Sequence, residues 1–280
     1  MTVIDTAGTG NRGLIRLGHG LSDGMMIAYR NLSQLRHSPG AIIGTIAFPL
    51  AFVLLFGYVF GSAISVGDGA NYREYLMPGL FVMGITMGTM SSMIVVAADN
   101  GRGVMDRLRS MPIARSAVPF GQTASDLIIA AATLAIMAAT GLLVGWRAQN
   151  GLGSAVAAFG LLLLLQYAMS WIGVYIGSLV KDEEAGAKLG PVMMPVTMLS
   201  NVFVPTDGMP TVLRVIAEWN PVSAATAACR ELFGNPGAPA ADAAWPLAHP
   251  VLATVGWCTL LLAVLVPLTV RRFSRAHDGG

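Results

Sequence analysis

The chain has 280 residues, of which 54% are hydrophobic and 11% are charged. A soluble domain carries roughly 25% charged residues, so the composition excludes an ordinary soluble globule, which needs more polar side chains to cover its surface. The net charge of +2 comes with no basic stripe interleaved with aromatic residues, which argues against nucleic-acid binding.

The segment before the first apolar run divides into two parts. Residues 1–20 are rich in Gly, Thr and Asn and are predicted to be disordered. Residues 21–36 form a predicted amphipathic helix that ends before Pro39. Because this helix directly precedes an apolar run, we expect it to lie along the membrane surface. Its apolar positions recur at helical spacing, at Met25, Ala28, Tyr29, Leu32 and Leu35.

Six apolar runs predict an all-α integral membrane fold. Crossing about 30 Å of hydrocarbon takes about 20 apolar residues as a helix, because every backbone polar group must be satisfied within the segment. The fifth run is short and contains Pro191 and Pro195, so five and seven spans are the alternative counts. The predicted spans are residues 41–64, 76–98, 127–146, 152–180, 189–205 and 251–270.

The placement of Lys and Arg predicts the orientation. With six spans, both termini and the loops after the second and fourth spans lie on one side, and most of the 17 Lys and Arg residues fall there. By the positive-inside rule this side is the cytoplasm. We therefore expect a multi-pass plasma-membrane protein with both termini inside, residues 273–280 being a cytoplasmic tail. The basic residues on the other side are Arg73, Arg147, Arg214 and Arg230.

A compact basic segment, residues 99–115, follows the second span and holds four arginines. Val104, Leu108 and Met111 fall on one helical face, and Pro112 stops the helix. Arg102, Asp106 and Arg109 fall on the opposite face. We interpret the segment as a short amphipathic helix with one side for the membrane domain and the other for a cytoplasmic partner. The alternative is a charged loop that only sets the topology.

The loop between the last two spans, residues 206–250, is predicted to be structured. Pro210 can open a short helix that runs to Trp219, and a second helical stretch covers residues 222–233. Both are apolar, so we expect them to dip into the extracytoplasmic interface, with Trp219 and Trp245 as anchors at headgroup level. The alternative is a disordered loop.

Several motifs together resemble the ABC type-2 permeases, most closely their daunorubicin-resistance-type drug-exporter branch. The resemblance covers about residues 21–272 and depends on the combination, since each motif is weak alone. The motifs are residues 103–112 (GVMDRLRSMP) with 114–116, residues 201–205 (NVFVP) with 208–210, and residues 220–222 with Arg230.

The resemblance implies a half-transporter that dimerises with a second copy or a homologue and binds a separate cytoplasmic ATPase subunit. By that likeness the helix after the second span is the coupling helix, and residues 21–36 form an interface helix. Where many members have a glutamate, this chain has Asp99-Asn100-Gly101-Arg102, so Asp99 and Asp106 are alternative acidic contacts. The candidate coupling residues are Asp99, Arg102, Gly103, Asp106, Arg107, Leu108, Arg109 and Pro112.

The energy source is expected to be another chain. A phosphate-binding loop ends in Gly-Lys-Ser/Thr, whereas Lys181 and Lys188 follow Val180 and Ala187. We expect ATP and Mg²⁺ to be bound by the partner ATPase, with no cofactor, metal site or catalytic residue in this chain. An intramembrane hydrolase lacks support because His-Glu-x-x-His and Gly-x-Ser-x-Gly are absent.

The spans carry few candidates for a substrate path. Tyr167, Trp171 and Tyr175 line one side of the fourth span, and Asn201 is polar within the fifth; packing between helices is the alternative for all four. Asp126 is expected at the wetted cytoplasmic edge of the third span. The lack of a midspan ionisable group argues against a proton-coupled secondary transporter. We expect a hydrophobic or amphipathic cargo, either a drug or a lipid; a non-transporting scaffold is a further alternative.

Overall fold

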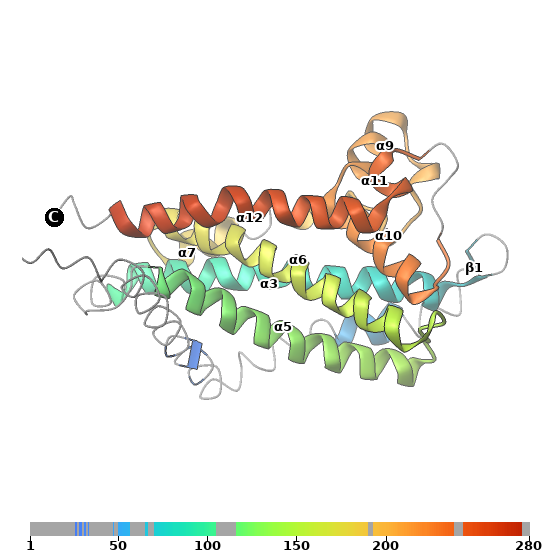
Figure 1. Cartoon of the computed structure of the whole chain (residues 1–280), viewed down its shortest axis with the longest axis horizontal. Helices are drawn as coiled ribbons and strands as arrows, with labels where there is room; N and C mark the ends of the chain where they lie inside the picture. The colour runs from blue at the N-terminus through green and yellow to red at the C-terminus, as the bar shows by residue number, and fades with distance from the viewer. Residues whose placement is uncertain are drawn as a thin grey trace, which may run out of the picture.

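The computed structural model describes residues 26, 28, 29, 31, 33, 47, 50–56, 65–66, 70–104, 116–189, 193–237 and 243–275. Long helices lie side by side along the long axis of the molecule (Figure 1). Within the described residues, four helices are long and apolar enough to cross a membrane. They are α3 (Tyr72–Gly101), α5 (Ala117–Val144), α6 (Gly151–Leu179) and α12 (Pro250–Arg275).

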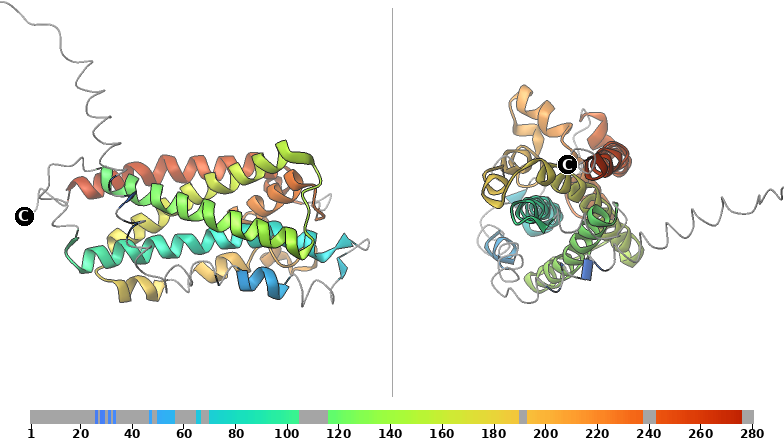
Figure 2. Two further views of the ribbon diagram at one scale, coloured as in Figure 1. Left: turned by 90° about the horizontal axis from the view of Figure 1, so that it is seen from below. Right: turned by 90° about the vertical axis from the view of Figure 1, so that its left-hand side faces the viewer.

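The four long helices differ in how deeply they are buried. In the most apolar stretch of each helix, the share of buried residues is 61% for α3 and 50% for α6. It is 28% for α5 and 17% for α12. The view along the bundle shows α3 with other helices on several sides and α12 at the edge (Figure 2). The pair α3 and α6 therefore forms the centre of the bundle, and α5 and α12 keep wide apolar faces for lipid or protein.

The bundle has two unlike ends (Figure 1). At the end that we call the basic end, α3 finishes, α5 begins and α12 finishes, next to α7 (Glu183–Leu189). At the other end, which we call the far end, α5 is joined to α6, and α9 (Thr211–Glu218), α10 (Pro221–Phe233) and α11 (Trp245–Ala248) gather. A two-residue antiparallel pair, β1 (Ser65–Val66) with β2 (Ala70–Asn71), precedes α3.

Close packing of α3 on α6 depends on two glycines. A Cβ atom added at Gly173 would lie 2.5 Å from the carbonyl oxygen of Thr89, and one added at Gly177 would lie 2.6 Å from that of Met93. Real Cβ atoms do not approach so closely, so only glycine lets the two backbones meet. These two glycines, four residues apart on α6, thus serve helix packing.

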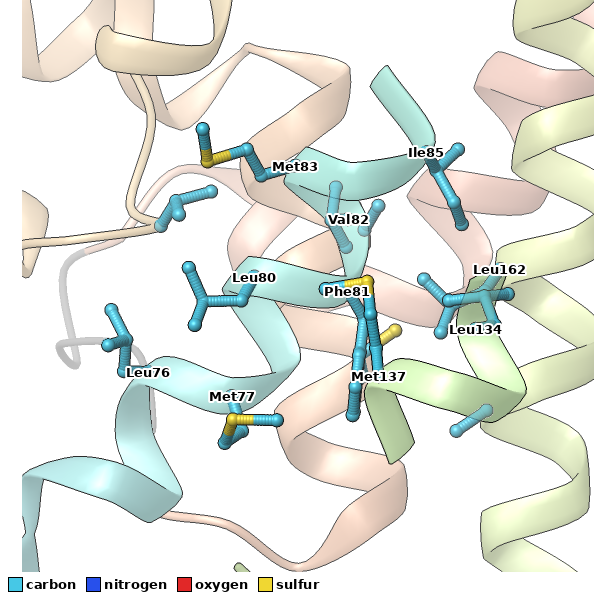
Figure 3. Packing of buried hydrophobic residues seen from close by; sticks show 14 of the residues in the cluster. Leu76, Met77, Leu80, Phe81, Val82, Met83, Ile85, Leu134, Met137 and Leu162 are labelled. Carbon is cyan, nitrogen blue, oxygen red and sulfur yellow. The ribbon is translucent and has the colours of Figure 1, made fainter. Parts of the chain in front are cut away.

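Aromatic and sulfur-containing side chains fill the core toward the far end. Phe81, Trp146 and Phe233 meet edge to face, with ring centroids 5.0 to 6.0 Å apart, an arrangement that aromatic pairs prefer. The close-up shows Phe81 of α3 beside Met137 of α5, and Leu134 beside Leu162 of α6 (Figure 3). This core joins α3, α5 and α6 to the short helix α10.

The predicted fifth span is wrong as a single helix. After α7, the helix α8 (Met193–Met198) is only six residues long, and residues 199–205 form turns that lead to the 3₁₀ turn η4 (Thr206–Gly208). Of the first predicted span, Ala47 and residues 50–56 are helical, and the rest lies outside the described residues. The six-span count is therefore an expectation that the described residues do not establish.

The loop before α12 is helical as predicted, but one of its helices is not at an interface. In α10, residues 222–230 are all buried against the bundle. By contrast α9 exposes Val212, Val215 and Ile216, and Trp219 and Trp245 are also exposed. Of these two helices, α9 therefore has the apolar exposed face that a helix in the interface needs.

Candidate functional site

The basic segment leaves the bundle at the end of α3. The last helical residue is Gly101, and Gly103 has a φ of +66°, the left-handed conformation in which glycine commonly ends a helix. Val104 then packs against Val96 and Val174. Among the predicted coupling residues, Asp99 is buried in the last turn of α3, whereas Arg102 is exposed. The other predicted coupling residues, Asp106, Arg107, Leu108, Arg109 and Pro112, lie outside the described residues.

The last turn of α3 is tied to the end of α6. The Asn100 side-chain amide donates to the carbonyl oxygens of Gly177 and Val180, both at 3.1 Å. Arg102 forms an ion pair with Glu183 at 3.1 Å, but the two side chains are 69% and 58% exposed, so the pair adds little stability. Asn100 is therefore the main polar link. Sequence reasoning missed it, although a carboxamide at the end of an apolar span is a signal.

A hydrogen-bonded chain of polar side chains crosses the helices near the basic end. Ser92 Oγ donates to Asp126 Oδ2 at 2.7 Å, and Gln122 Nε2 donates to Asp126 Oδ1 at 2.8 Å. Asn31 Nδ2 donates to Gln122 Oε1 at 2.7 Å. These hydrogen bonds thus join the helical residues near the N-terminus to α5 and α3.

Asp126 was expected at the cytoplasmic edge of the third span, and the structure places it within α5. Because α5 begins at Ala117, Asp126 lies about 14 Å inside the helix at 1.5 Å per residue. A carboxyl group inside an apolar helix is costly unless it is hydrogen-bonded, and Ser92 and Gln122 provide those bonds. Hydropathy did not find the start of α5, because polar side chains that pair with one another inside the bundle lower the hydropathy of a helix as exposed ones do.

We expect Asp126→Leu to lower the thermal unfolding temperature in detergent, because it leaves the buried Gln122 donor without an acceptor, a cost of about 1–3 kcal/mol. Asp126→Asn should cost less, since its carbonyl oxygen can still accept. The control is Thr133→Val in the same helix, where the hydroxyl bonds only to Ile129 of its own α5. Equal unfolding temperatures for Asp126→Leu and Thr133→Val would show that the hydrogen bonds of Asp126 contribute nothing to stability.

The residues predicted to line a substrate path lie in different parts of the bundle. Trp171 is fully buried, edge-on to Phe120 of α5 at 5.0 Å and near Tyr167 at 6.2 Å. Tyr167 and Tyr175 are half-buried on α6. Asn201 lies at the far end, where its carbonyl oxygen accepts from the Tyr75 hydroxyl at 3.2 Å. The structure therefore brings Tyr167 and Trp171 together but places Asn201 in another cluster.

That second cluster centres on Arg230, which was expected on the outer side as a loop charge but is 2% exposed. Its Nε donates to the carbonyl oxygen of Tyr75 at 2.9 Å, and its Nη2 donates to those of Asn201 at 2.9 Å and Val202 at 3.2 Å. The guanidinium carbon lies 3.7 Å from the centre of the Tyr75 ring. Burial lowers the pKa of the Arg230 guanidinium from its ordinary value. Arg230 thus fastens α10 to the start of α3 and to the turn after α8.

The Asn220-Pro221 motif starts α10 in the same region. The Asn220 side chain accepts from the amide of Val222 at 2.9 Å, which caps the helix, and Pro221 occupies a first-turn position where no amide donor is needed. Asn220 Nδ2 also donates to the carbonyl oxygen of Leu199 at 2.8 Å. The motif is therefore a cap that also holds the end of α8.

Residues 24–233 match the family described as ABC-2 type transporter, a range that includes α3, the polar link at Asn100, and Arg230. The chain belongs to this family. As an ABC-2 permease it is a multi-pass membrane protein of the ABC transporter class.

Three relatives illustrate the likeness of this ABC-2 permease to others. It is 30% identical to the daunorubicin resistance ABC transporter permease protein DrrB1 of Streptomyces coeruleorubidus, over 89% of this chain and 86% of the relative. It is 22% identical to the doxorubicin resistance ABC transporter permease protein DrrB of Mycobacterium tuberculosis, over 89% of each chain. It is 24% identical to the putative transport permease ycf38 of Cyanophora paradoxa, over 75% of this chain and 73% of the relative.

Proposed function

We propose that this ABC-2 permease is the membrane subunit of an ATP-driven exporter, and that residues 103–112 seat in a separate cytoplasmic ATPase subunit. The family match over residues 24–233 is the observation that carries the proposal. The polar link supports it, because the basic segment leaves α3 where Asn100 grips α6. Since Asp99 is buried, Asp106 is the acid that we assign to the ATPase contact. ATP and Mg²⁺ would be bound by that partner.

Two permease subunits, either identical or homologous, would enclose the pathway, with the basic end and both termini in the cytoplasm. The wide apolar faces of α5 and α12 leave room for a second subunit as well as for lipid. The names of two relatives, which refer to daunorubicin and doxorubicin resistance, favour a drug-like amphipathic cargo. A lipid is the alternative cargo, and it fits the same apolar spans.

Asp126 supports one second candidate, an ion-coupled secondary transporter. A carboxyl group inside a membrane helix is the kind of residue that carries protons or cations in such transporters. The two functions differ in their energy source. Transport that requires the ATPase and survives collapse of the proton gradient supports the exporter, and the reverse result supports the ion-coupled transporter.

We expect Arg107→Glu and Asp106→Lys to reduce permease-stimulated ATP hydrolysis by about tenfold or more, because reversing a charge at a contact places like charges together, which costs several kcal/mol. The measurement is co-purification of the ATPase subunit with a tagged permease, followed by hydrolysis rates in proteoliposomes. Membrane insertion should be unchanged, since a single charge in the segment does not decide the topology.

Arg147→Glu is the matched control, because it makes the same charge reversal on an exposed side chain at the far end. It should leave both co-purification and hydrolysis at wild-type levels. If the reversals at Arg107 and Asp106 behave like Arg147→Glu, the segment does not contact the ATPase and the coupling assignment is wrong.

A further inference from the structure

The end of α6 is capped by a side chain from another helix. The last carbonyl groups of an α-helix lack partners within the helix and need donors from elsewhere. In α6 the carbonyl of Gly177 and that of Val180, just past the helix end, both accept from the amide of Asn100 on α3. Both hydrogens of that NH₂ group are therefore used, and the carboxamide is held by two bonds rather than one.

The backbones around Asn100 are also in direct contact. A Cβ atom added at Gly101 would lie 3.2 Å from both the Cα and the Cβ of Asp182, and one added at Gly186 would lie 3.0 Å from the Cβ of Ala97. Together with the contact of Gly177 on α3, these distances show that α3 packs closely on the end of α6, on the turn at residues 180–182 and on α7. The last turns of α3, the end of α6 and the start of α7 are packed as one body.

A third helix joins the same place. Arg272 of α12 donates from Nε and Nη2 to the carbonyl oxygen of Ser178, at 3.2 and 3.0 Å. A cation at a helix C-terminus also interacts favourably with the partial negative charge there. Phe273 packs in the cluster formed by Val96 and Val174. The end of α6 is thus held by α3 on one side and by α12 on another.

We infer that this cluster is a rigid joint, with Asn100 as its positioning residue, which delivers displacement of residues 103–112 to α6 and α12. The inference rests on the proposed function, since it assumes that an ATPase moves residues 103–112. The chain passes from Asn100 to the start of that segment at Gly103 within one turn. A pull on the segment therefore reaches the end of α6 directly, through two hydrogen bonds and a backbone contact.

The first test uses the permease with its ATPase in proteoliposomes. Leu152→Cys places a thiol at an exposed position at the far end of α6, and its labelling by a membrane-impermeant maleimide is followed with and without ATP. Cys229 and Cys258 are both buried, so they stay in place. We expect ATP to change the labelling rate in the parent protein, and Asn100→Leu to shrink that change by at least about fivefold, the lower end of typical allosteric coupling.

Two variants separate coupling from mere stability. Asn100→Gln keeps an amide donor and should restore a large part of the change. Asn150→Leu removes a similar amide bond, from Nδ2 to the Glu231 carbonyl at 2.8 Å, at the opposite end of α6, and should leave the ATP response intact. A full ATP response in Asn100→Leu overturns the inference, and so does loss of ATPase binding in that variant. Absence of ATPase binding or ATP response in the parent protein is instead a failure of the proposed function.

A cross-link tests rigidity without relying on Asn100. Gly101→Cys with Asp182→Cys puts two Cβ atoms within a few tenths of an ångström of the 3.5–4.5 Å that a disulfide needs. We expect the disulfide to form on mild oxidation and the oxidised complex to keep its ATP response at Leu152→Cys. A response that is lost on oxidation and returns with reductant means that the two segments move apart during the cycle. That result, or failure of the disulfide to form, overturns the inference.

Discussion

Gly173→Ala should strongly destabilise the protein. On α6 only Gly177→Ala should have a comparable effect among the glycine-to-alanine changes. The new Cβ would lie 2.5 Å from the Thr89 carbonyl oxygen and 2.8 Å from the Cβ of Ser92. The carbonyl belongs to the backbone of α3 and cannot rotate away like a flexible side chain, so α3 and α6 must separate by about 1 Å at their closest contact. Overpacking typically costs about 1–3 kcal/mol and occasionally more, and we expect the upper end here.

Gly160→Ala is the matched control, because it adds the same methyl group to the same helix at a position with no atom within 4 Å. It should leave the unfolding temperature unchanged or raise it slightly, since alanine favours a helix over glycine by up to about 1 kcal/mol. The measurement is the fraction of monodisperse protein that survives heating in detergent. Equal survival of the two variants would show that α3 and α6 do not meet as closely as described.

The sequence predicted the long helices well because the length of an apolar run is sufficient to identify them. Residues 76–98, 127–146, 152–180 and 251–270 correspond to α3, α5, α6 and α12. The helix ends were less accurate wherever polar residues are buried. The start of α5 is the clearest case: Gln122, Ser125 and Asp126 lower the hydropathy, but they pair with one another and with Ser92 inside the bundle.

The fifth span shows the opposite error. Residues 189–205 are apolar enough to suggest a membrane helix, but hydropathy does not register where a helix stops. In the structure α8 ends at Met198, and the following turn is held by side chains distant in sequence, among them Asn220, whose amide reaches the carbonyl of Leu199. A single sequence gives no sign of such a contact.

The charge pattern of the sequence located the candidate site, but it did not predict most of the contacts around that site. The four arginines in a short segment between apolar spans can be read directly from the sequence. The joint behind that segment cannot be, because Asn100 bonds to the backbone carbonyls of Gly177 and Val180. Every residue has a carbonyl group, so no residue type marks the acceptor. The same reasoning explains why Arg230 was counted only as a basic residue on the outer side, although it is buried.

Arg230→Met should have the second large effect, because the three carbonyl groups that its side chain binds cannot be changed along with it. Two opposing costs decide the sign. A buried cation carries a desolvation penalty, and replacing both partners of a buried pair by apolar groups is often neutral or stabilising. Here only one partner is replaced, and it leaves the Val202 carbonyl without its donor and the Tyr75 ring without its cation. We therefore expect a loss of about 1–3 kcal/mol, the cost of a buried polar group left without its partner, with the lost ring contact adding to it.

Arg230→Lys tests whether charge or shape holds the far end together. A lysine keeps the charge, but its single ammonium group cannot reproduce the fork that reaches Tyr75 on one side and Asn201 with Val202 on the other. It should recover only part of the stability lost in Arg230→Met, as measured by survival on heating in detergent. The exposed Arg147→Met serves as the control for loss of a surface charge and should stay within about 0.5 kcal/mol of wild type.

The alternative outcome has a distinct meaning. If Arg230→Met raised the unfolding temperature, the desolvation cost would exceed the value of the three hydrogen bonds and the ring contact. Arg230 would then lower the stability of the fold. Its role would be to allow α10 to move against α3, and not to hold the two helices together. Survival in the order wild type, Arg230→Lys, Arg230→Met is what a fixed clamp requires, because each step removes more of the bonds that join α10 to the start of α3 and to the turn after α8.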